Sequence, residues 1–424
     1  MIEVLNRKVL QMATIRSAAV ALSLFLQIWL VATFGAATYG DYVIFVTLCS
    51  LVTIISIGGL DTQALKISAI DRSVSGRNAK LDLLHSPFIT RGLIFTTICC
   101  LIIWCLSSFN IDYFSRLPIF SWTLLYVATV GAVTFQILIA VLRGIGRPVL
   151  ADLFDAIIRN TFTGLIALFL TAAFTATLNH AVMAYAFSFY FCLFAIVLVT
   201  GIRPAPPATR DTPKPQYTTR MHFGFMLTGL VSYAFFQLDT LILSAQVSAT
   251  ELGAYNMACN LVRAVIFIPL ILVVLIQPRI AVEFERNNFR AVARIAAAGI
   301  GLSIFAAIGC AVALWMIGGY ILSLIAPEFL VAREAMLILS AAHVVNSALI
   351  IVAGVISMSG RFFDIAKAQV VGSIVSVALY IVLIPLHGQQ GAALSVLIGL
   401  VAVGISYIFL YRSLIPRIYG FLLP

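Results

Sequence analysis

The sequence has very few charged residues. Only 10% of its 424 residues are Asp, Glu, Lys or Arg, whereas 62% are hydrophobic and the mean hydropathy is +1.09. A soluble domain usually has about 25% charged residues. This composition excludes a soluble protein, and it indicates a chain embedded in lipid, where apolar side chains need no burial against each other.

The sequence also lacks the residue arrangements that mark most enzymes and metalloproteins. None of the seven cysteines forms a CxxC pair, and all seven fall inside apolar runs, as small buried hydrophobic residues do. We find no Walker-type glycine loop, no metal-ligand cluster and no nucleophile–base pair. We therefore expect a protein that is not an enzyme and has no catalytic residues, no metal and no bound cofactor.

Long apolar runs fill most of the chain. A membrane-spanning helix needs roughly 20 predominantly apolar residues, and twelve segments of the sequence meet this requirement. They are residues 10–34, 42–65, 88–109, 119–142, 149–174, 181–202, 221–245, 254–278, 293–317, 334–358, 365–386 and 391–411. The sequence thus predicts an all-α integral membrane protein with twelve transmembrane helices.

The lysines and arginines indicate how these helices are oriented. If the N-terminus is cytoplasmic, 22 of the 26 lysines and arginines fall in cytoplasmic segments, and only Arg116 and Arg333 fall in outside loops. This asymmetry is the positive-inside rule. We therefore expect both termini in the cytoplasm, and we interpret the net charge of +10 as a topology signal and a contact for anionic membrane lipids, not for nucleic acid.

One segment differs in composition from the rest of the chain. Residues 203–220, RPAPPATRDTPKPQYTTR, contain five prolines and several basic residues, which is typical of an extended polar connector. The sequence therefore predicts an N-terminal six-helix bundle at 1–202, a cytoplasmic linker at 203–220 and a C-terminal six-helix bundle at 221–424.

The two predicted bundles share a repeat. GAATYGDY at 35–42 and SATELGAY at 248–255 agree at their Gly and Tyr positions, and two further landmarks keep nearly the same offset. The pairs are Tyr42 and Tyr255, Lys66 and Arg279, and Gly146 and Gly360, which lie 213 or 214 residues apart. Because each half has an even number of helices, the repeat is parallel, and transporters commonly place the substrate path between such halves. We interpret the shared Gly and Tyr as a turn and an interfacial anchor at the start of a helix.

Several stretches of the sequence are similar to one known group of proteins. FGAATYGDYVIFVTLCSLVTIISIGGLDTQALK (34–66), VLRGIGRPVLAD (141–152) and LIAPEFLVAREAMLILSAAHVVNSALIIVAGVISMSGR (324–361) resemble the polysaccharide exporters of the MOP superfamily. Residues 235–281, with an Asp before an apolar run, then GxY and PR, also fit that pattern. The resemblance extends over nearly the whole chain, but its motifs are poor at naming a substrate.

This resemblance implies a Wzx-like flippase of the bacterial inner membrane. Such a protein moves an undecaprenyl-diphosphate-linked oligosaccharide from the cytoplasmic to the periplasmic leaflet by alternating access, for the synthesis of O-antigen, lipopolysaccharide or exopolysaccharide. Its expected partners are a polysaccharide polymerase and the chain-length machinery. Coupling to H⁺ or Na⁺ is left open.

Two alternatives to a flippase are considered. A MATE-like cation-coupled antiporter of drugs or organic cations shares the superfamily, but prokaryotic members typically carry an acid in helix 1, which this chain lacks. Lipid II flippases usually have two further helices. A membrane glycosyltransferase or polymerase is least favoured, because the predicted outside loops are too short to build walls around a reactive site.

The leading candidate for binding a diphosphate is Arg263. Arginine binds phosphate oxygens with two parallel hydrogen bonds, and a charge within a membrane helix usually faces a cavity or a partner. Asn256, Asn260 and Arg263 lie at i, i+4 and i+7, on one helix face. Asp239, at a similar depth in the preceding helix, is a candidate for substrate binding or proton coupling, and a structural ion pair with Arg263 is the alternative.

Four further residues are candidates at lower weight. Arg159 lies deep in a helix, with Asp155 at i−4 as its alternative ion-pair partner. Arg16 could contact the diphosphate at the cytoplasmic mouth or extend to the membrane interface. Gln27 is a candidate for lining the path. His343 is a candidate for proton coupling, with ordinary packing or hydrogen bonding as the alternative.

Overall fold

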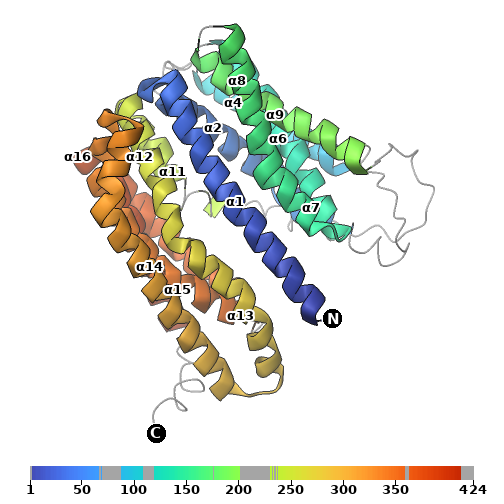
Figure 1. Cartoon of the computed structure of the whole chain (residues 1–424), viewed down its shortest axis with the longest axis vertical. Helices are drawn as coiled ribbons and strands as arrows, with labels where there is room; N and C mark the ends of the chain where they lie inside the picture. Colours follow the sequence, from blue (N-terminus) through green and yellow to red (C-terminus); the bar gives the residue numbers. More distant parts are fainter. Residues whose placement is uncertain are drawn as a thin grey trace, which may run out of the picture. The chain divides into compact units, whose positions relative to one another are not determined.

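The structure is a computed structural model that describes residues 2–65, 68, 87–107, 119–174, 176–200, 230, 231, 233, 235, 237–358 and 362–411. The regular secondary structure of these residues is helical throughout (Figure 1). The chain divides into two compact units, Met1–Tyr233 and Ala234–Pro424. The predicted linker at 203–220 lies outside the described residues, so the domain boundaries stay a prediction.

The first unit contains the six helices predicted for the first half. Its elements are α1 (Ile2–Phe34), α2 (Ala36–Ile57), α4 (Pro87–Ser107), α6 (Ile119–Gly144), α7 (Pro148–Asp152), η2 (Leu153–Ile158), α8 (Arg159–Ala173) and α9 (Leu178–Thr200). The predicted helix at 149–174 is formed by α7, η2 and α8 in succession, and its middle part, η2, is a π-helix. A π-helical turn changes which side chains align along the helix.

Helix α6 lies at the centre of the first unit, where it packs against α2, α4 and α9 (Figure 1). A small residue allows the close approach to α9: a Cβ added to Gly131 would lie 3.0 Å from the Cβ of Phe189. The Tyr190 hydroxyl donates to the Val127 carbonyl at 2.8 Å. Small residues and interhelical hydrogen bonds are what hold helices together in lipid, since burial of apolar side chains gains little there.

The second unit contains the helices predicted for the second half. Its elements are α11 (Leu238–Ser244), α12 (Ala249–Val262), η3 (Arg263–Ile266), α13 (Phe267–Glu285), α14 (Phe289–Ile325), η4 (Pro327–Ala332), α15 (Arg333–Met358) and α16 (Phe362–Tyr411). The predicted helix at 254–278 is formed by α12, η3 and α13. Only part of the predicted helix at 221–245 falls within the described residues, and α11 is its end.

Helix α16 is a hairpin of two helices. Gly388 has φ 53° and ψ −126°, which interrupts the helix. The Ser376 hydroxyl donates to the Ser395 carbonyl at 3.2 Å, and a Cβ on Gly372 would lie 2.3 Å from Val403 Cγ2. In one continuous helix, residues 372 and 403 would be roughly 45 Å apart. Residues before and after Gly388 therefore run antiparallel, as predicted for helices 365–386 and 391–411.

The number of membrane helices is roughly consistent with the predicted twelve. Among the residues that the structure describes, nine helices are long and apolar enough to cross a membrane, and a shorter apolar helix covers Ile89–Cys105. One of the nine is α16, whose two arms supply two spans. The chain is therefore a multi-pass membrane protein, with a fold that fits twelve predicted helices.

The start of α2 differs from its predicted form. Gly35, with φ 86°, makes the turn, and the helix begins at Ala36. Gly40 and Tyr42 therefore lie inside α2 and not in the turn before it, and Gly40 is buried.

The equivalent stretch in the second unit shows the same difference. Ser248 caps α12 and forms a capping box with Glu251, while Gly253 and Tyr255 lie buried within the helix. GAATYGDY and SATELGAY do mark the starts of two helices. The interpretation of the shared glycines as turns is wrong, because the turns precede them and both glycines lie within helices. Tyr255 is fully buried, so it is not an interfacial anchor, whereas an anchoring role for Tyr42 stays a prediction.

Candidate functional site

Asp239 is the centre of a buried hydrogen-bond network in the second unit. It lies in the first turn of α11 and is 4% exposed. The Tyr255 hydroxyl donates to its Oδ2 at 2.6 Å, while the Thr240 amide and hydroxyl donate to its Oδ1 at 2.6 and 3.3 Å. Burial of a carboxylate is costly unless it is hydrogen-bonded. These three donors therefore account for how the acid can lie within the helical core.

This hydrogen-bond network replaces the ion pair between Asp239 and Arg263 that the sequence analysis considers. Arg263 is close enough to Asp239 to act on it electrostatically. Among the described residues, however, no carboxylate lies within the 4.0 Å ion-pair distance of Arg263. The Asp239 oxygens are instead occupied by Tyr255 and Thr240, so the alternative of a direct Asp239–Arg263 ion pair is wrong.

Arg263 lies at a break in its helix. Helix α12 ends at Val262, and Arg263 opens the 3₁₀ turn η3, after which α13 begins. Its side chain is exposed. One turn earlier, the Asn260 amide donates to the backbone carbonyl and the side-chain oxygen of Asn256, both at 2.9 Å. The two asparagines therefore lie on one face of α12, and the place of Arg263 on that face stays a prediction, because the 3₁₀ turn changes the helical periodicity there.

His343 lies on α15, which packs against both α12 and η3. Its Nδ1 atom is buried and has no hydrogen-bond partner among the residues that the structure describes. Arg263 is close enough to His343 to act on it electrostatically. Arg263 and His343 thus lie on elements that pack against each other, an arrangement that the sequence did not predict, because the residues are far apart along the chain and no shared motif links them.

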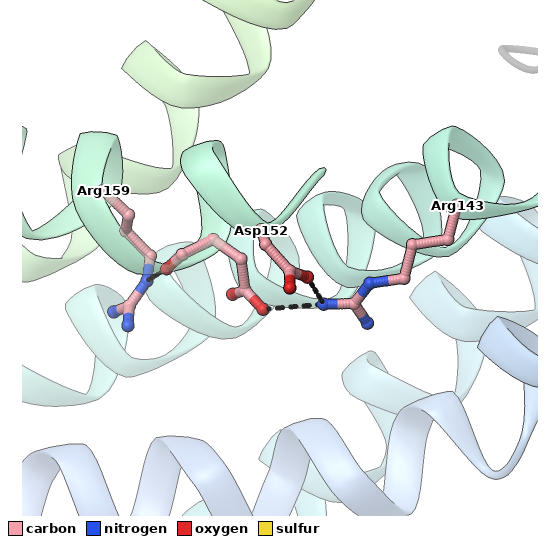
Figure 2. Close-up of polar contacts among 4 residues, drawn as sticks. Arg143, Asp152 and Arg159 are labelled. Carbon is pink, nitrogen blue, oxygen red and sulfur yellow. Dashed lines mark hydrogen bonds and ion pairs between the residues drawn. The ribbon is translucent and has the colours of Figure 1, made fainter. Parts of the chain in front are cut away.

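The acids of the first unit are held by Arg143, at the end of α6 (Figure 2). Its Nη2 atom lies 3.1 Å from Asp152 Oδ1 and 3.3 Å from Asp155 Oδ2. Arg159 does not bind the Asp155 carboxylate; its Nε donates to the Asp155 backbone carbonyl at 3.2 Å. The alternative of an Asp155–Arg159 ion pair is therefore wrong.

The π-helix explains this exchange of partners. An i,i+4 ion pair requires the 3.6 residues per turn of an α-helix. Asp155 lies within η2, where each turn holds an additional residue, so side chains four apart no longer align. The carboxylates of Asp152 and Asp155 both lie within ion-pair distance of Arg143. This pairing could not be predicted, because no sequence pattern indicates the π-helix.

Arg159 is left with an aromatic contact. Its guanidinium carbon lies 5.6 Å from the centroid of the Phe189 ring, a cation–π arrangement. It also acts electrostatically on Tyr42 and Tyr185, which touch each other edge to face with ring centroids 6.2 Å apart. Within the described part of the chain, no carboxylate lies at ion-pair distance from Arg159.

The remaining candidates lie in α1. Gln27 accepts a hydrogen bond from the Tyr39 hydroxyl at 2.9 Å and donates to the Ser23 hydroxyl at 3.3 Å. Its amide thus joins α1 to α2, and its role in lining a path stays a prediction. Arg16 lies within α1, but its side chain is outside the described part of the structure.

The described residues contain no group of three or more His, Cys, Asp or Glu that could hold a metal ion. The polar groups that we consider for function are the Arg143 cluster with Arg159 in the first unit, and Asp239, the asparagine pair, Arg263 and His343 in the second. These groups can bind anions or polar head groups, and the buried acid Asp239 can exchange a proton.

No protein-family model and no curated protein sequence matches the chain. Solved structures do. A multidrug-resistance MATE family transporter of the MOP superfamily, in an inward-facing conformation, has a TM-score of 0.71 at 13% identity, covering 96% of this chain and 99% of its own. The lipid II flippase MurJ, in an inward closed conformation, has a TM-score of 0.67 at 14% identity, covering 95% and 87%.

A third similar structure is a MOP superfamily transporter from Pyrococcus furiosus, described as having a binding pocket of reversed polarity. Its TM-score is 0.60 at 15% identity, covering 98% of this chain and 95% of its own. The likeness extends over nearly the full length of all three proteins. With its helical units and multiple spans, the chain has the MATE/MOP fold.

Proposed function

We propose that the chain is a transporter that flips undecaprenyl-diphosphate-linked oligosaccharide from the cytoplasmic to the periplasmic leaflet by alternating access. The structural likeness to a lipid II flippase and to MATE transporters supports a transport role. We place the protein in the bacterial inner membrane with both termini cytoplasmic. A polysaccharide polymerase and chain-length machinery would consume the flipped substrate.

The observation that carries this proposal is that two arginines in membrane segments have, within the described part of the chain, no carboxylate close enough to form an ion pair. Arg159 and Arg263 lie within segments long and apolar enough to span the membrane, one in each unit. Among the described residues, neither has a carboxylate at ion-pair distance. A charged residue at the centre of a membrane helix costs about 2.5–3.5 kcal/mol on insertion scales. Guanidinium groups that carry this cost without a carboxylate at ion-pair distance are suited to a cargo with phosphate oxygens.

Three buried or half-buried acids also favour a negatively charged cargo. Asp239 accepts three hydrogen bonds, and Asp152 and Asp155 share the cation of Arg143. An organic cation would need an acid free to receive it, and these three are already engaged. The arrangement therefore favours an anionic cargo over a cationic one.

A MATE-like antiporter of organic cations is the second candidate. It is favoured by the similarity to MATE structures and by Asp239, a buried carboxylate that could release and bind a proton during exchange. In such a protein Asp239→Asn would abolish export, whereas Arg263→Ala would be tolerated.

Leaflet-resolved labelling of a lipid-linked oligosaccharide in proteoliposomes tests the proposal. The wild-type protein should move the glycan across the bilayer, and Arg263→Ala and Arg159→Gln should each slow this movement at least tenfold. Arg333→Gln, at an exposed arginine that begins α15, is the matched control and should leave the rate unchanged. A normal rate for Arg263→Ala would reject the site. Proton-driven uptake of an organic cation, without movement of the glycan, would establish the antiporter instead.

A further inference from the structure

We propose that Arg143 is a positioning residue, which holds the Asp155 carboxylate and so keeps it from pairing with Arg159. The guanidinium of Arg159 is thereby left for an anionic cargo, a role that rests on the proposed function. The choice of partners among these three side chains depends on contacts within the first unit, and it can be tested without any cargo.

A tight turn brings the acids to Arg143. Helix α6 ends in a Schellman motif, in which the Arg147 amide donates to the Leu142 carbonyl at 2.9 Å. The Gly146 amide donates to the Arg143 carbonyl at 3.1 Å, and Gly146 has φ 79°, a left-handed conformation that suits glycine. Helix α7 begins at Pro148 and packs against α6. The residues after the turn therefore return alongside the end of α6, where Arg143 lies.

Arg143 contacts two acids with one nitrogen atom. Its Nη2 lies 3.1 Å from Asp152 Oδ1 and 3.3 Å from Asp155 Oδ2 (Figure 2). Asp152 is buried, whereas Asp155 is 28% exposed. Because an acid without a cation costs more where it is buried, Asp152 is the partner through which Arg143 acts on stability. Asp155 is the partner through which it acts on Arg159.

Arg159 already contacts Asp155 through the backbone. Its Nε donates to the Asp155 carbonyl at 3.2 Å, while its guanidinium carbon lies 5.6 Å from the centroid of the Phe189 ring. The two residues are four apart, which is the spacing of an ion pair in an α-helix. The π-helical turn η2 and the contact with Arg143 hold the carboxylate in a different arrangement. Without Arg143, a change in the Asp155 side chain or a return to α-helical spacing would bring carboxylate and guanidinium together.

An ion pair between Asp155 and Arg159 would compete with the cargo. A phosphate group binds a guanidinium through the same N–H donors that a carboxylate uses. It would have to displace Asp155 before it could bind Arg159. By holding this carboxylate at the end of α6, Arg143 removes the competitor from the arginine that lies deeper in the helix.

A double-mutant cycle tests the exchange of partners without any cargo. Asp155→Asn and Arg159→Gln would be combined in the full-length protein in detergent, and the shift in unfolding temperature measured. Coupling between them should be weak when Arg143 is present and clearly larger in the Arg143→Gln background. Asp155→Asn keeps the backbone carbonyl, so the cycle isolates the carboxylate. Asp152→Asn is the control, and its coupling to Arg159→Gln should be the same in both backgrounds. Equal Asp155–Arg159 coupling in the two backgrounds overturns the proposal.

Flipping of lipid-linked oligosaccharide in proteoliposomes tests the consequence for transport. Arg143→Gln should slow flipping about tenfold or more, the effect of losing a hydrogen bond to a charged group at Arg159. Adding Asp155→Asn should restore most of the rate, because the competing carboxylate is gone. Arg143→Lys keeps a cation and should retain most of the rate. Arg286→Gln, at an exposed arginine of the second unit, is the control and should flip as the wild type does.

Stability is separated from positioning by the choice of acid. In the Arg143→Gln background, Asp152→Asn should recover unfolding temperature but not the flipping rate, and Asp155→Asn should recover the rate. Where Arg143→Gln alone does not fold, the Arg143→Gln/Asp152→Asn protein is compared with and without Asp155→Asn. Recovery of flipping by Asp152→Asn and not by Asp155→Asn would show a purely structural role and overturn the proposal, as would an unchanged rate for Arg143→Gln.

Failure of the two proposals can be told apart. A wild-type protein that flips no glycan, with Asp155–Arg159 coupling that grows in the Arg143→Gln background, rejects the flippase and supports the exchange of partners. Flipping that needs Arg159, with equal coupling in both backgrounds, rejects the positioning role of Arg143 alone.

Discussion

The Tyr255 hydroxyl donates a hydrogen bond of 2.6 Å to Asp239 Oδ2 and so joins α12 to α11 in the second unit. Its repeat partner in the first unit, Tyr42, instead packs edge to face against Tyr185, with ring centroids 6.2 Å apart. The same position of the repeat thus holds its helix by a polar contact in one unit and by an aromatic contact in the other. A carboxylate buried in a membrane helix is what requires the polar contact.

Tyr255→Phe should destabilise the second unit. The variant keeps the ring but removes one of the donors to a buried carboxylate, a loss typically of about 1–3 kcal/mol in the free energy of unfolding. The unfolding temperature of the purified protein in detergent checks this. Tyr42→Phe is the matched control, because the Tyr42 hydroxyl makes no hydrogen bond with the described residues, and it should change stability by less than about 0.5 kcal/mol. Equal effects of the two substitutions would contradict the role given to the Tyr255 hydroxyl.

The positions of the helices could be predicted because a bilayer demands roughly 20 apolar residues for each span. Even the hairpin at Gly388 follows from two apolar runs with a glycine between them. The partners of the polar residues could not be predicted in the same way. α-Helical spacing offers Asp155 as an alternative ion-pair partner for Arg159, whereas the structure, with a π-helical turn at Asp155, pairs it with Arg143. Proximity of side chains on different helices, as for Arg143 and Asp152, depends on packing that a single sequence does not specify.

Arg143→Gln should destabilise the first unit because two acids lose the cation that they share. Asp152 is 4% exposed and Asp155 is 28% exposed, so loss of their shared cation costs more at Asp152. We expect Arg143→Gln to lower the free energy of unfolding by about 1–3 kcal/mol, and Asp152→Asn to recover part of this loss in the double variant. A double-mutant cycle measures the coupling, which should be larger with Asp152→Asn than with Asp155→Asn.

The control for this cycle is the pair of Arg286 and Glu283, at 3.4 Å, in which the arginine side chain is 70% exposed. An exposed ion pair contributes about 0–1 kcal/mol. Arg286→Gln should therefore have a small effect. Coupling energies near zero for both acids of the first unit would show that Arg143 is a surface cation of the same kind.

Gly388→Ala should destabilise the α16 hairpin by a purely conformational effect. At φ 53° and ψ −126°, the backbone of Gly388 is in a region that costs a residue with a Cβ about 1–3 kcal/mol. The added Cβ would meet nothing nearer than Val247 Cγ1 at 4.0 Å, so a steric clash is not the cause. Gly309→Ala in α14 is the matched control: its Cβ meets nothing within 4 Å, and it should stabilise the helix by about 0.5–1 kcal/mol. Equal unfolding temperatures for the two variants would contradict a strained turn at Gly388.

The orientation of the chain can be tested with single cysteines in a cysteine-free variant. Ala176→Cys lies between α8 and α9, where the positive-inside rule places a periplasmic turn, and Ala176 is exposed. Arg210→Cys lies in the linker predicted to be cytoplasmic. In intact cells, a membrane-impermeant maleimide should label Ala176→Cys and not Arg210→Cys, and both should react after the inner membrane is permeabilised. The reverse pattern would invert the assigned topology. It would also turn the direction of the proposed transport around, because the basic segments that we place on the cytoplasmic side would then face the periplasm.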